Sequence, residues 1–199
     1  KVSIESTDGR IIYASAIVPA ISSTFQKYEV SLIPNAALIQ SSTLDVVFVI
    51  SVEGTASSTV EEGTQIFFQL VSLYPPTWRN KPRGLRIDIA DKLAAAKPAI
   101  LRFPGGSFIQ GIKVGDEVIP YMWEETLGPI EQRPGYIGIW GYYASNGMGM
   151  LEYLEFAEEL NATAVICVYS GLALGSYSHP IEEMGEFVES ALNAIEYTI

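Results

Sequence analysis

Hydrophobic and polar residues alternate in short runs over the first part of the chain. The runs are "KVSIES", "RIIYASA", "TFQKYEVSL", "LDVVFVISV" and "TQIFFQLVSL", with turn residues such as Asp8-Gly9 between them. Short β-rich segments at this spacing are typical of an antiparallel sandwich. The pattern predicts an all-β domain over residues 1–74. Because its first strand begins at residue 1, we expect the chain to start partway through that domain.

After Pro76 the hydrophobic spacing becomes helical, and helices alternate with strands. Helices are predicted at 84–97, at 149–160 and from Pro180 onward, with strands at 99–103 and 164–169. The last helix carries an apolar stripe from Met184 to Ile195. Between them, residues 104–149 contain aromatics, glycines and scattered charges without a clear period, which is long for a structureless loop unless it builds a site.

Helices that alternate with strands indicate a parallel sheet, either open and doubly wound or closed into a β/α barrel. In both architectures ligands bind at the carboxyl ends of the strands. The loops that follow Phe103 and Tyr169 are therefore predicted to share one functional rim. The glycine-rich turn of dinucleotide-binding proteins, G-x-G-x-x-G, does not occur in the sequence. We predict an α/β domain over residues 75–199.

Composition narrows the range of partners. The chain of 199 residues has 12 basic and 23 acidic residues and a net charge of −11, so neither nucleic acid nor an anionic membrane is an expected partner. Its apolar runs are shorter than the roughly 20 residues of a membrane span, and "KVSIES" shows no signal-peptide pattern. A single cysteine, Cys167 in "AVICVY", predicts a buried, inert thiol.

Five short motifs follow one another in the second part of the chain. They are R-F-P-G-G (102–106), W-x-x-T-x-G-P (123–129), R-P-G (133–135), W-x-Y (140–142) and G-x-G-x-x-E-Y (147–153). In this order they resemble the α-L-arabinofuranosidases of glycoside hydrolase family 51 in their fungal form. The resemblance covers residues 67–199 well. The β-rich part before them is similar to the carbohydrate-binding-module-like sandwich of these enzymes.

The resemblance implies a fold and an activity. The fold is a portion of a (β/α)8 TIM barrel, holding strands two and three, preceded by part of an antiparallel β-sandwich. The activity is a retaining glycosidase that releases terminal α-L-arabinofuranosyl groups from arabinan or arabinoxylan, without cofactor or metal. In the family the acid/base glutamate follows strand four and the nucleophile follows strand seven, so no catalytic residue is expected within this chain. The remaining part of the same enzyme is the expected partner, and secretion from the cell is expected.

Five residues are predicted to contact or support the sugar. Gly105 and Gly106 allow close approach of backbone to a ligand, although a tight turn alone would also explain them. Arg102 is expected on a buried strand beside the site carboxylates, or else paired structurally under the loop. Ser107 stands where the family commonly has Asn, which leaves substrate preference open. Trp140 aligns with an aromatic that borders the sugar, or else anchors a loop.

Other polar and aromatic residues are predicted to have structural roles. Glu124 and Glu125 are adjacent in the chain, so their side chains usually point in different directions and make a poor pair of facing catalytic carboxylates. Trp123 is expected to anchor a loop, and Trp78 is expected to be structural. Asp116, Glu117 and Glu131 are predicted to be solvated loop charges, and His179 is predicted to be a polar loop residue. Asn161-Ala162-Thr163 is an N-glycosylation sequon, which is consistent with secretion.

Two classes of function remain open at this point. One is part of an arabinofuranosidase; the other is a carbohydrate-binding or otherwise non-catalytic piece, because the catalytic pair is not expected in the chain. Within the enzyme class, a related endoglucanase or β-xylosidase specificity is the alternative that the sequence leaves open.

Overall fold

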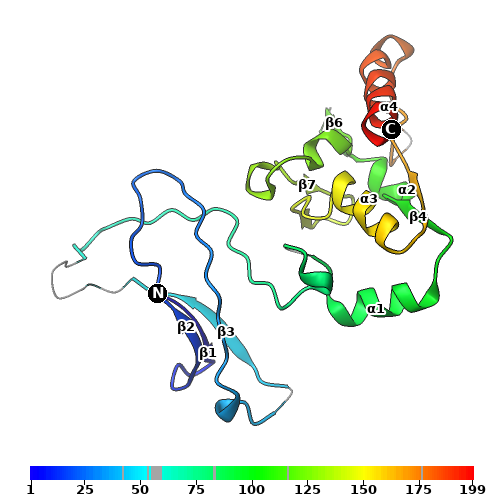
Figure 1. Ribbon diagram of the computed structural model, residues 1–199. Coiled ribbons are helices and arrows are strands. Elements are labelled where there is room, and N and C mark those ends of the chain that lie inside the picture. The colour runs from blue at the N-terminus through cyan, green and yellow to red at the C-terminus, as the bar shows by residue number, and fades with distance from the viewer. Residues whose placement is uncertain (42, 53, 55–59, 83, 116, 176) are drawn as a thin grey trace. The chain divides into compact units, whose positions relative to one another are not determined.

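The chain divides into two compact units, Lys1–Phe67 and Phe68–Ile199. The computed structural model describes residues 1–199 except 42, 53, 55–59, 83, 116 and 176 (Figure 1). The assignment of the first unit to a carbohydrate-binding module and of the second to a barrel stays a prediction.

The first unit contains a three-stranded antiparallel sheet in the order β2-β1-β3, formed by β1 (Val2–Ser6), β2 (Ile12–Ala16) and β3 (Val46–Ile50), with a short 3-10 helix η1 (Ala36–Leu38). The Asp8-Gly9 turn joins β1 to β2 as predicted. Gly9 has a φ of 70°, and an Asp8 carboxylate oxygen accepts bonds from Ser6 Oγ and the Arg10 backbone N–H. The strands predicted in "KVSIES", "RIIYASA" and "LDVVFVISV" are confirmed, as β1, β2 and β3 respectively.

Two predicted strands of this region are wrong. Residues 24–32 and 64–73, all of them described, form no strand. A segment with an alternating pattern forms a strand only where a neighbouring strand supplies its hydrogen-bond partners. Both edges of β1, the central strand, are already paired with β2 and β3.

The second unit alternates short helices and strands. Its elements in chain order are η2 (Trp78–Asn80), α1 (Ile87–Ala96), β4 (Ile100–Phe103), α2 (Gly106–Ile109), β5 (Ile112–Val114), β6 (Glu117–Ile119), η3 (Trp123–Thr126), η4 (Ile130–Gln132), β7 (Tyr136–Ile137), β8 (Tyr143–Ala144), α3 (Met150–Glu159), β9 (Thr163–Ile166), β10 (Leu172–Ala173), β11 (Tyr177–Ser178), η5 (Ile181–Glu183) and α4 (Gly185–Thr198). The predicted helices are present, and the unstructured stretch 104–149 is built from short hairpins and helical turns.

Strands β4 and β9 are parallel neighbours, as the helix-strand alternation predicts. Arg102 lies opposite Val165, and Phe103 lies opposite Ile166. Helix α3 connects the two strands and contacts both. Strand β9 is shorter than predicted and ends at Ile166, after which the Cys167 N–H donates to the Phe103 carbonyl at 2.7 Å. The carboxyl ends of both strands therefore lie side by side (Figure 1).

One face of this two-stranded sheet is covered. Leu101 packs in a cluster with Phe156 of α3, and Phe103 stacks on Tyr153 of α3 with ring centroids 3.6 Å apart. On the other face Ile100 is 61% exposed and Val165 39% exposed. The sheet in this chain is thus half-buried, with one face open to solvent.

The loop between α2 and α3 is held in place by the residues of the predicted motifs. Arg133 is 8% exposed and donates to Glu152, to the Gly128 carbonyl and to the Asn146 carbonyl. The buried Thr126 hydroxyl accepts from the Met150 N–H at 2.9 Å. These bonds tie the W-x-x-T-x-G-P, R-P-G and G-x-G-x-x-E-Y motifs into one network at the start of α3.

Helix α4 buries a narrower face than its apolar stripe predicts. Phe187 and Ala194 are 5% exposed, but Val188, Leu192 and Ile195 are more than half exposed. The Trp123 indole N–H donates to the Ser190 carbonyl at 3.0 Å, which joins the long loop to α4. The structural roles predicted for Trp123 and Trp78 are confirmed, since the Trp78 indole donates to Asp91 at 2.9 Å and packs against Phe156.

Candidate functional site

The R-F-P-G-G turn leads from the carboxyl end of β4 into the four-residue helix α2. Gly105 has a φ of −80°, which any residue adopts, and added side chains at Gly105 and Gly106 would meet no atom within 4 Å. Neither the backbone conformation nor local packing therefore requires glycine here. What distinguishes the turn is its open backbone, which suits close approach by a ligand. Ser107, in α2, is exposed beside it.

Arg102 is exposed, which corrects the prediction that its strand is buried. Side chains alternate along a strand, so Leu101 and Phe103 take the helix-facing side and Arg102 shares the open face with Ile100. Among the described residues, no hydrogen bond or ion pair of the Arg102 side chain is observed. The guanidinium is therefore free to donate hydrogen bonds to a carboxylate on the open face.

A row of aromatic rings extends from the turn. Phe108 of α2 lies 6.4 Å from Trp140, with the ring planes 20° apart, and Trp140 lies 6.0 Å from Tyr142, with the planes 12° apart. Trp140 is 55% exposed and Tyr142 is 57% exposed. Trp140 therefore borders the R-F-P-G-G turn through Phe108, and Tyr142, which sequence reasoning did not single out, continues the row.

The row rests on a buried anchor at the base of the β7–β8 hairpin. Tyr136 is 4% exposed, lies 5.2 Å from Phe108 ring to ring, and donates its hydroxyl to the Phe108 carbonyl at 3.3 Å. Burial, reinforced by nearby Tyr169, raises the pKa of Tyr136 to about 12, so the hydroxyl remains a donor over the physiological range. At the tip, Gly141 with a φ of 77° donates to the Gly138 carbonyl at 3.0 Å.

His179 lies in the loop after β11, as predicted for a polar loop residue, and its ring also takes part in an aromatic corner. Its ring packs against Tyr169, Tyr177 and Phe187 at centroid distances of 6.0, 5.3 and 4.9 Å. Its Nδ1 lies 2.9 Å from a Glu183 carboxylate oxygen. This corner lies in the region after β9, which contains the second loop of the predicted rim. The aromatic residues around His179 are separated by loops along the chain, so their spacing in the sequence did not predict the corner.

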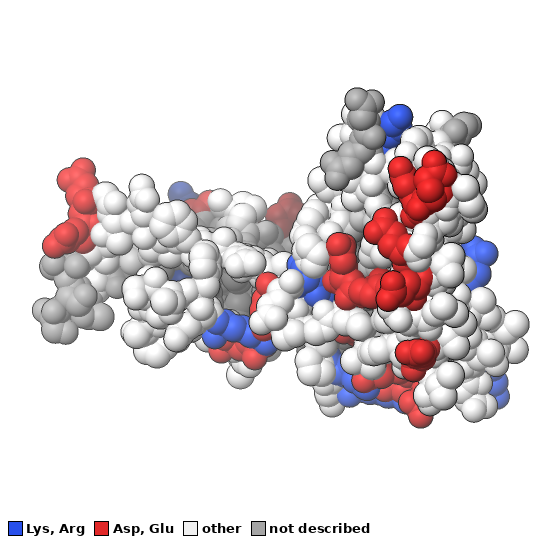
Figure 2. Space-filling model, turned by 90° about the horizontal axis from the view of Figure 1, so that it is seen from above, with Lys and Arg blue, Asp and Glu red and all other residues white. Residues whose placement is uncertain are grey.

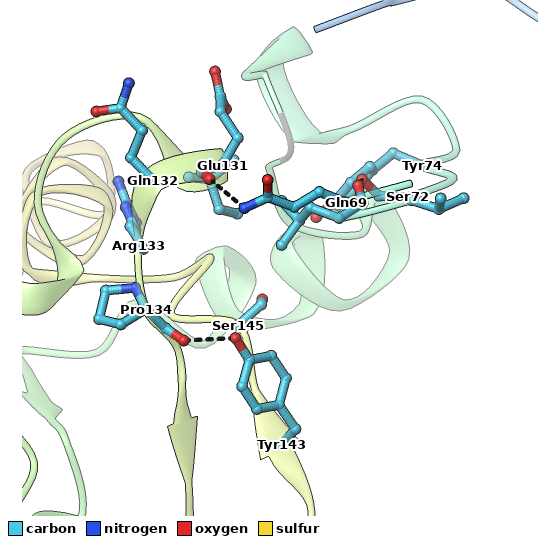
Figure 3. Close-up of a pocket in the computed structure, with 12 residues that line it drawn as sticks. Gln69, Ser72, Tyr74, Glu131, Gln132, Arg133, Pro134, Tyr143 and Ser145 are labelled. Carbon is cyan, nitrogen blue, oxygen red and sulfur yellow. Dashed lines mark hydrogen bonds between the residues drawn. The ribbon is translucent and has the colours of Figure 1, made fainter. Parts of the chain in front are cut away.

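A separate pocket is lined in part by residues of the long loop (Figure 3). It has a volume of about 860 Å³ and lies between residues 69–74 and 130–145. The Gln69 amide donates to the Glu131 carbonyl at 3.4 Å, and the Tyr143 hydroxyl donates to the Pro134 carbonyl at 2.7 Å. Glu131 lines this pocket and is half-buried in η4, so the prediction of a solvated loop charge is wrong for it. None of the predicted sugar-site residues lines the pocket.

The adjacent carboxylates differ in environment, as expected for neighbours. Glu124 is half-buried and Glu125 is exposed, and partial burial, with a smaller contribution from Glu124, raises the pKa of Glu125. Asp116 lies outside the described residues, and Glu117 lies in β6. Within the described residues, no group of three His, Cys, Asp or Glu side chains is placed to hold a metal ion.

The predicted glycosylation residue lies at the opposite end of the sheet from the rim. Asn161 is exposed and follows α3 with a φ of 54°, a left-handed conformation that asparagine tolerates. It precedes β9, whose carboxyl end forms the rim.

Cys167, predicted to be buried, is half-buried and unpaired. Acidic side chains outnumber basic ones on much of the visible surface (Figure 2), and no helix within the described residues is long and apolar enough to cross a membrane.

Parallel strands joined by a helix, with an aromatic row beyond the carboxyl end of β4, define an α/β protein whose strand ends form a candidate site. The sequence profile of the α-L-arabinofuranosidase 1 domain matches residues 92–199. The chain belongs to this family.

Curated relatives and a solved structure agree with this assignment. A probable α-L-arabinofuranosidase A of Aspergillus terreus is 35% identical over 158 residues, 78% of this chain and 24% of that protein. α-L-Arabinofuranosidase 1 of Arabidopsis thaliana is 33% identical over 70% of this chain and 20% of its own length. An arabinose-bound family 51 α-L-arabinofuranosidase has a TM-score of 0.83 at 32% identity, covering 100% of this chain and 30% of that one. The chain thus spans about a quarter of the length of the first of these relatives.

Proposed function

We propose that this chain is part of a retaining α-L-arabinofuranosidase that releases terminal arabinofuranosyl groups from arabinan or arabinoxylan. The observation that carries the proposal is the family match over residues 92–199, which includes the R-F-P-G-G turn, Ser107 and Trp140. The arabinose bound to the solved relative supports the sugar class.

The chain's own contribution is to hold the sugar. Gly105, Gly106 and Ser107 are exposed at the start of α2, and Phe108 of the same helix stacks on Trp140, which supports a shared sugar site. Hydroxyl groups of a sugar can bond to the polar atoms while its C–H face covers the indole. Arg102, on the open sheet face, is placed to hold a carboxylate from a later strand in its ionised form.

Bond cleavage in a retaining glycosidase needs two carboxyl groups about 5–5.5 Å apart. One protonates the leaving oxygen while the other forms a covalent bond to the anomeric carbon; water then releases the sugar with the first group acting as base. We assign both to the remaining part of the same enzyme, whose strands would cover the open face of β4 and β9. Glycosylation at Asn161 and location outside the cell belong to this proposal, since the sequon side chain is exposed.

The test is hydrolysis of 4-nitrophenyl α-L-arabinofuranoside by the 199-residue protein and by the complete protein from the same source. We expect turnover by the complete protein alone. Turnover of an aryl β-xyloside or of a cello-oligosaccharide in its place would favour a β-xylosidase or an endoglucanase. Binding without turnover by the complete protein would establish a non-catalytic carbohydrate-binding role and contradict the proposal.

A further inference from the structure

The separate pocket of Figure 3 has a lining of its own. It includes neither the R-F-P-G-G turn nor any ring of the aromatic row. Gln69, Ser72 and Tyr74 stand on one wall, and Arg133 and Pro134 stand on the other (Figure 3). The volume of about 860 Å³ lies within the range of roughly 300–1,000 Å³ that is usual for small-molecule sites. The pocket is therefore large enough to hold a ligand away from the rim.

The walls of the pocket are held by contacts within the chain. The Gln69 amide bonds to the Glu131 carbonyl across the pocket, and the Tyr143 hydroxyl bonds to the Pro134 carbonyl at 2.7 Å. Leu70, which also lines the pocket, has a φ of 51°, a left-handed conformation that is unfavourable for leucine. Backbone strain of this kind is retained where the surrounding structure fixes it, and it is frequent at ligand sites.

The charges of the lining disfavour an anionic ligand. Arg133 is the single basic residue among the described lining residues, and its side chain is 4% exposed. Its guanidinium is already paired with the Glu152 carboxylate at 2.6 Å. Glu131 adds a negative charge to the same lining. Phosphate groups and carboxylates would therefore find no available cation in the pocket.

The other polar groups of the lining both donate and accept hydrogen bonds. Within the described residues, the Gln132 amide and the hydroxyl groups of Tyr74 and Ser145 have no partner. Sugar hydroxyl groups also donate and accept, so they match amides and hydroxyls. The rings of Tyr74 and Tyr143 are 46% and 57% exposed and offer apolar faces to the C–H side of a sugar. The lining thus favours a neutral, polyhydroxylated ligand with apolar faces.

We infer that this pocket is an accessory carbohydrate site that binds a neutral oligosaccharide apart from the rim. Arabinan and the xylan backbone both offer this chemistry, and separate probes distinguish them. The inference does not depend on the proposed activity, because bond cleavage at the rim requires no residue of the pocket. A ligand chain held here would raise the effective concentration of the same polysaccharide at the rim.

Amide NMR spectra of the isotope-labelled 199-residue protein test the inference, because they separate the two sites. The signals of Ser72 and Gln132 report on the pocket, and the signal of Ser107 reports on the rim. Linear arabinotriose and xylotriose are titrated separately. We expect at least one of them to shift the pocket signals, and the tighter one identifies the source of the ligand. Tyr74→Ala should weaken this binding about fivefold, the size of one aromatic contact, and Tyr74→Phe, which keeps the ring, should weaken it less.

Tyr142→Ala is the matched control, because Tyr142 is 57% exposed but belongs to the aromatic row. It should leave the affinity measured from the pocket signals unchanged. The inference is overturned if neither trisaccharide shifts these signals, if Tyr74→Ala keeps the affinity, or if Tyr142→Ala lowers it as much. It is also overturned if inorganic phosphate shifts the pocket signals as strongly as the sugars do.

The complete protein shows whether the pocket is open there as well. Hydrogen exchange of residues 69–74, measured by mass spectrometry, should slow when the tighter trisaccharide is added in excess. Exchange that is already slow without sugar and is unchanged by it would show that another protein segment fills the pocket, and would overturn the inference. Either failure leaves the proposed function intact, because turnover of the aryl arabinofuranoside tests that separately.

Discussion

Arg133 and Glu152 form a double hydrogen bond across the base of the long loop, with nitrogen–oxygen distances of 2.6 and 3.2 Å. The arginine side chain is 4% exposed and the glutamate 33%. Glu152 also accepts from the Gly149 N–H at the start of α3 at 2.9 Å. Two of the motifs that carry the family resemblance therefore stabilise the loop.

Replacing Arg133 with Met should destabilise the chain by about 3 kcal/mol, because it leaves Glu152 and two carbonyls without their donor in a buried setting. Urea unfolding measures the change. Arg86→Met is the control: Arg86 makes the same two-bond contact to Asp88, at 3.1 and 2.7 Å, but is exposed. Its effect should stay below about 1 kcal/mol. Equal losses for the two variants would show that burial does not decide the strength of the Arg133 contact.

Replacing Thr126 with Val should cost about 1–3 kcal/mol, since the shape is kept while the buried Met150 N–H loses its acceptor and the Trp123 carbonyl loses its donor. Thr126→Ser keeps the hydroxyl and should cost less. Thr198→Val, which removes an exposed bond to the Ile195 carbonyl, serves as control. The order of the three midpoints in thermal unfolding checks the prediction, and a Ser variant as weak as the Val variant would contradict it.

The raised pKa of Tyr136 predicts a loss of stability at high pH. The folded protein keeps this proton up to a pKa of about 12, while the unfolded chain releases it near the ordinary value of 10.0. Stability from this group is therefore full below about pH 10 and declines as pH rises toward about 12. Urea unfolding at pH 8 and pH 11 should show a smaller decline for Tyr136→Phe than for the unsubstituted protein. A decline of the same size in both would remove Tyr136 as a cause.

Arg102→Met in the complete enzyme should move the acidic limb of the pH–rate profile upward. The substitution keeps much of the volume but takes a positive charge from the carboxylate that we assign to a later strand, and the pKa of that carboxylate should rise. Rates on an aryl arabinofuranoside between pH 3 and pH 8 measure the shift. An unchanged profile would leave Arg102 with an architectural role only.

Ser107→Asn in the complete enzyme should change the discrimination between arabinofuranosides and xylosides by about 1–3 kcal/mol, the size of one hydrogen bond to a buried polar group. The ratio of kcat/KM for the two aryl glycosides gives the value. Ser72→Asn is a control for the same substitution outside the rim, because exposed Ser72 lines the separate pocket. No change in the ratio at Ser107 would separate this residue from sugar recognition.

Local periodicity was sufficient for the three main helices and the two parallel strands of the second unit, but not for the short elements within residues 104–149. The spacing around Leu154 in α3 and the apolar run in β9 predicted a helix feeding a parallel strand, because hydrophobic period depends only on which face of an element is buried. The ordered motifs, read as a resemblance, led to the family and to Ser107 and Trp140 as rim residues. The motif pattern did not distinguish Arg133, which is structural, from Arg102, which is a candidate site residue, since both arginines open motifs that contain proline and glycine.

Tertiary structure decided which residues meet. Phe108 and Trp140 are 32 positions apart in the chain and belong to different elements, so their near-parallel rings depend on how the hairpin folds back on α2. The same reason explains the half-exposed β4, the aromatic corner around His179 and the two β-rich segments, 24–32 and 64–73, that form no strand. Sequence by itself determined the faces and ends of elements, which are local properties. Partners, exposure and the aromatic row depend on packing between distant segments, and only the folded chain specifies them.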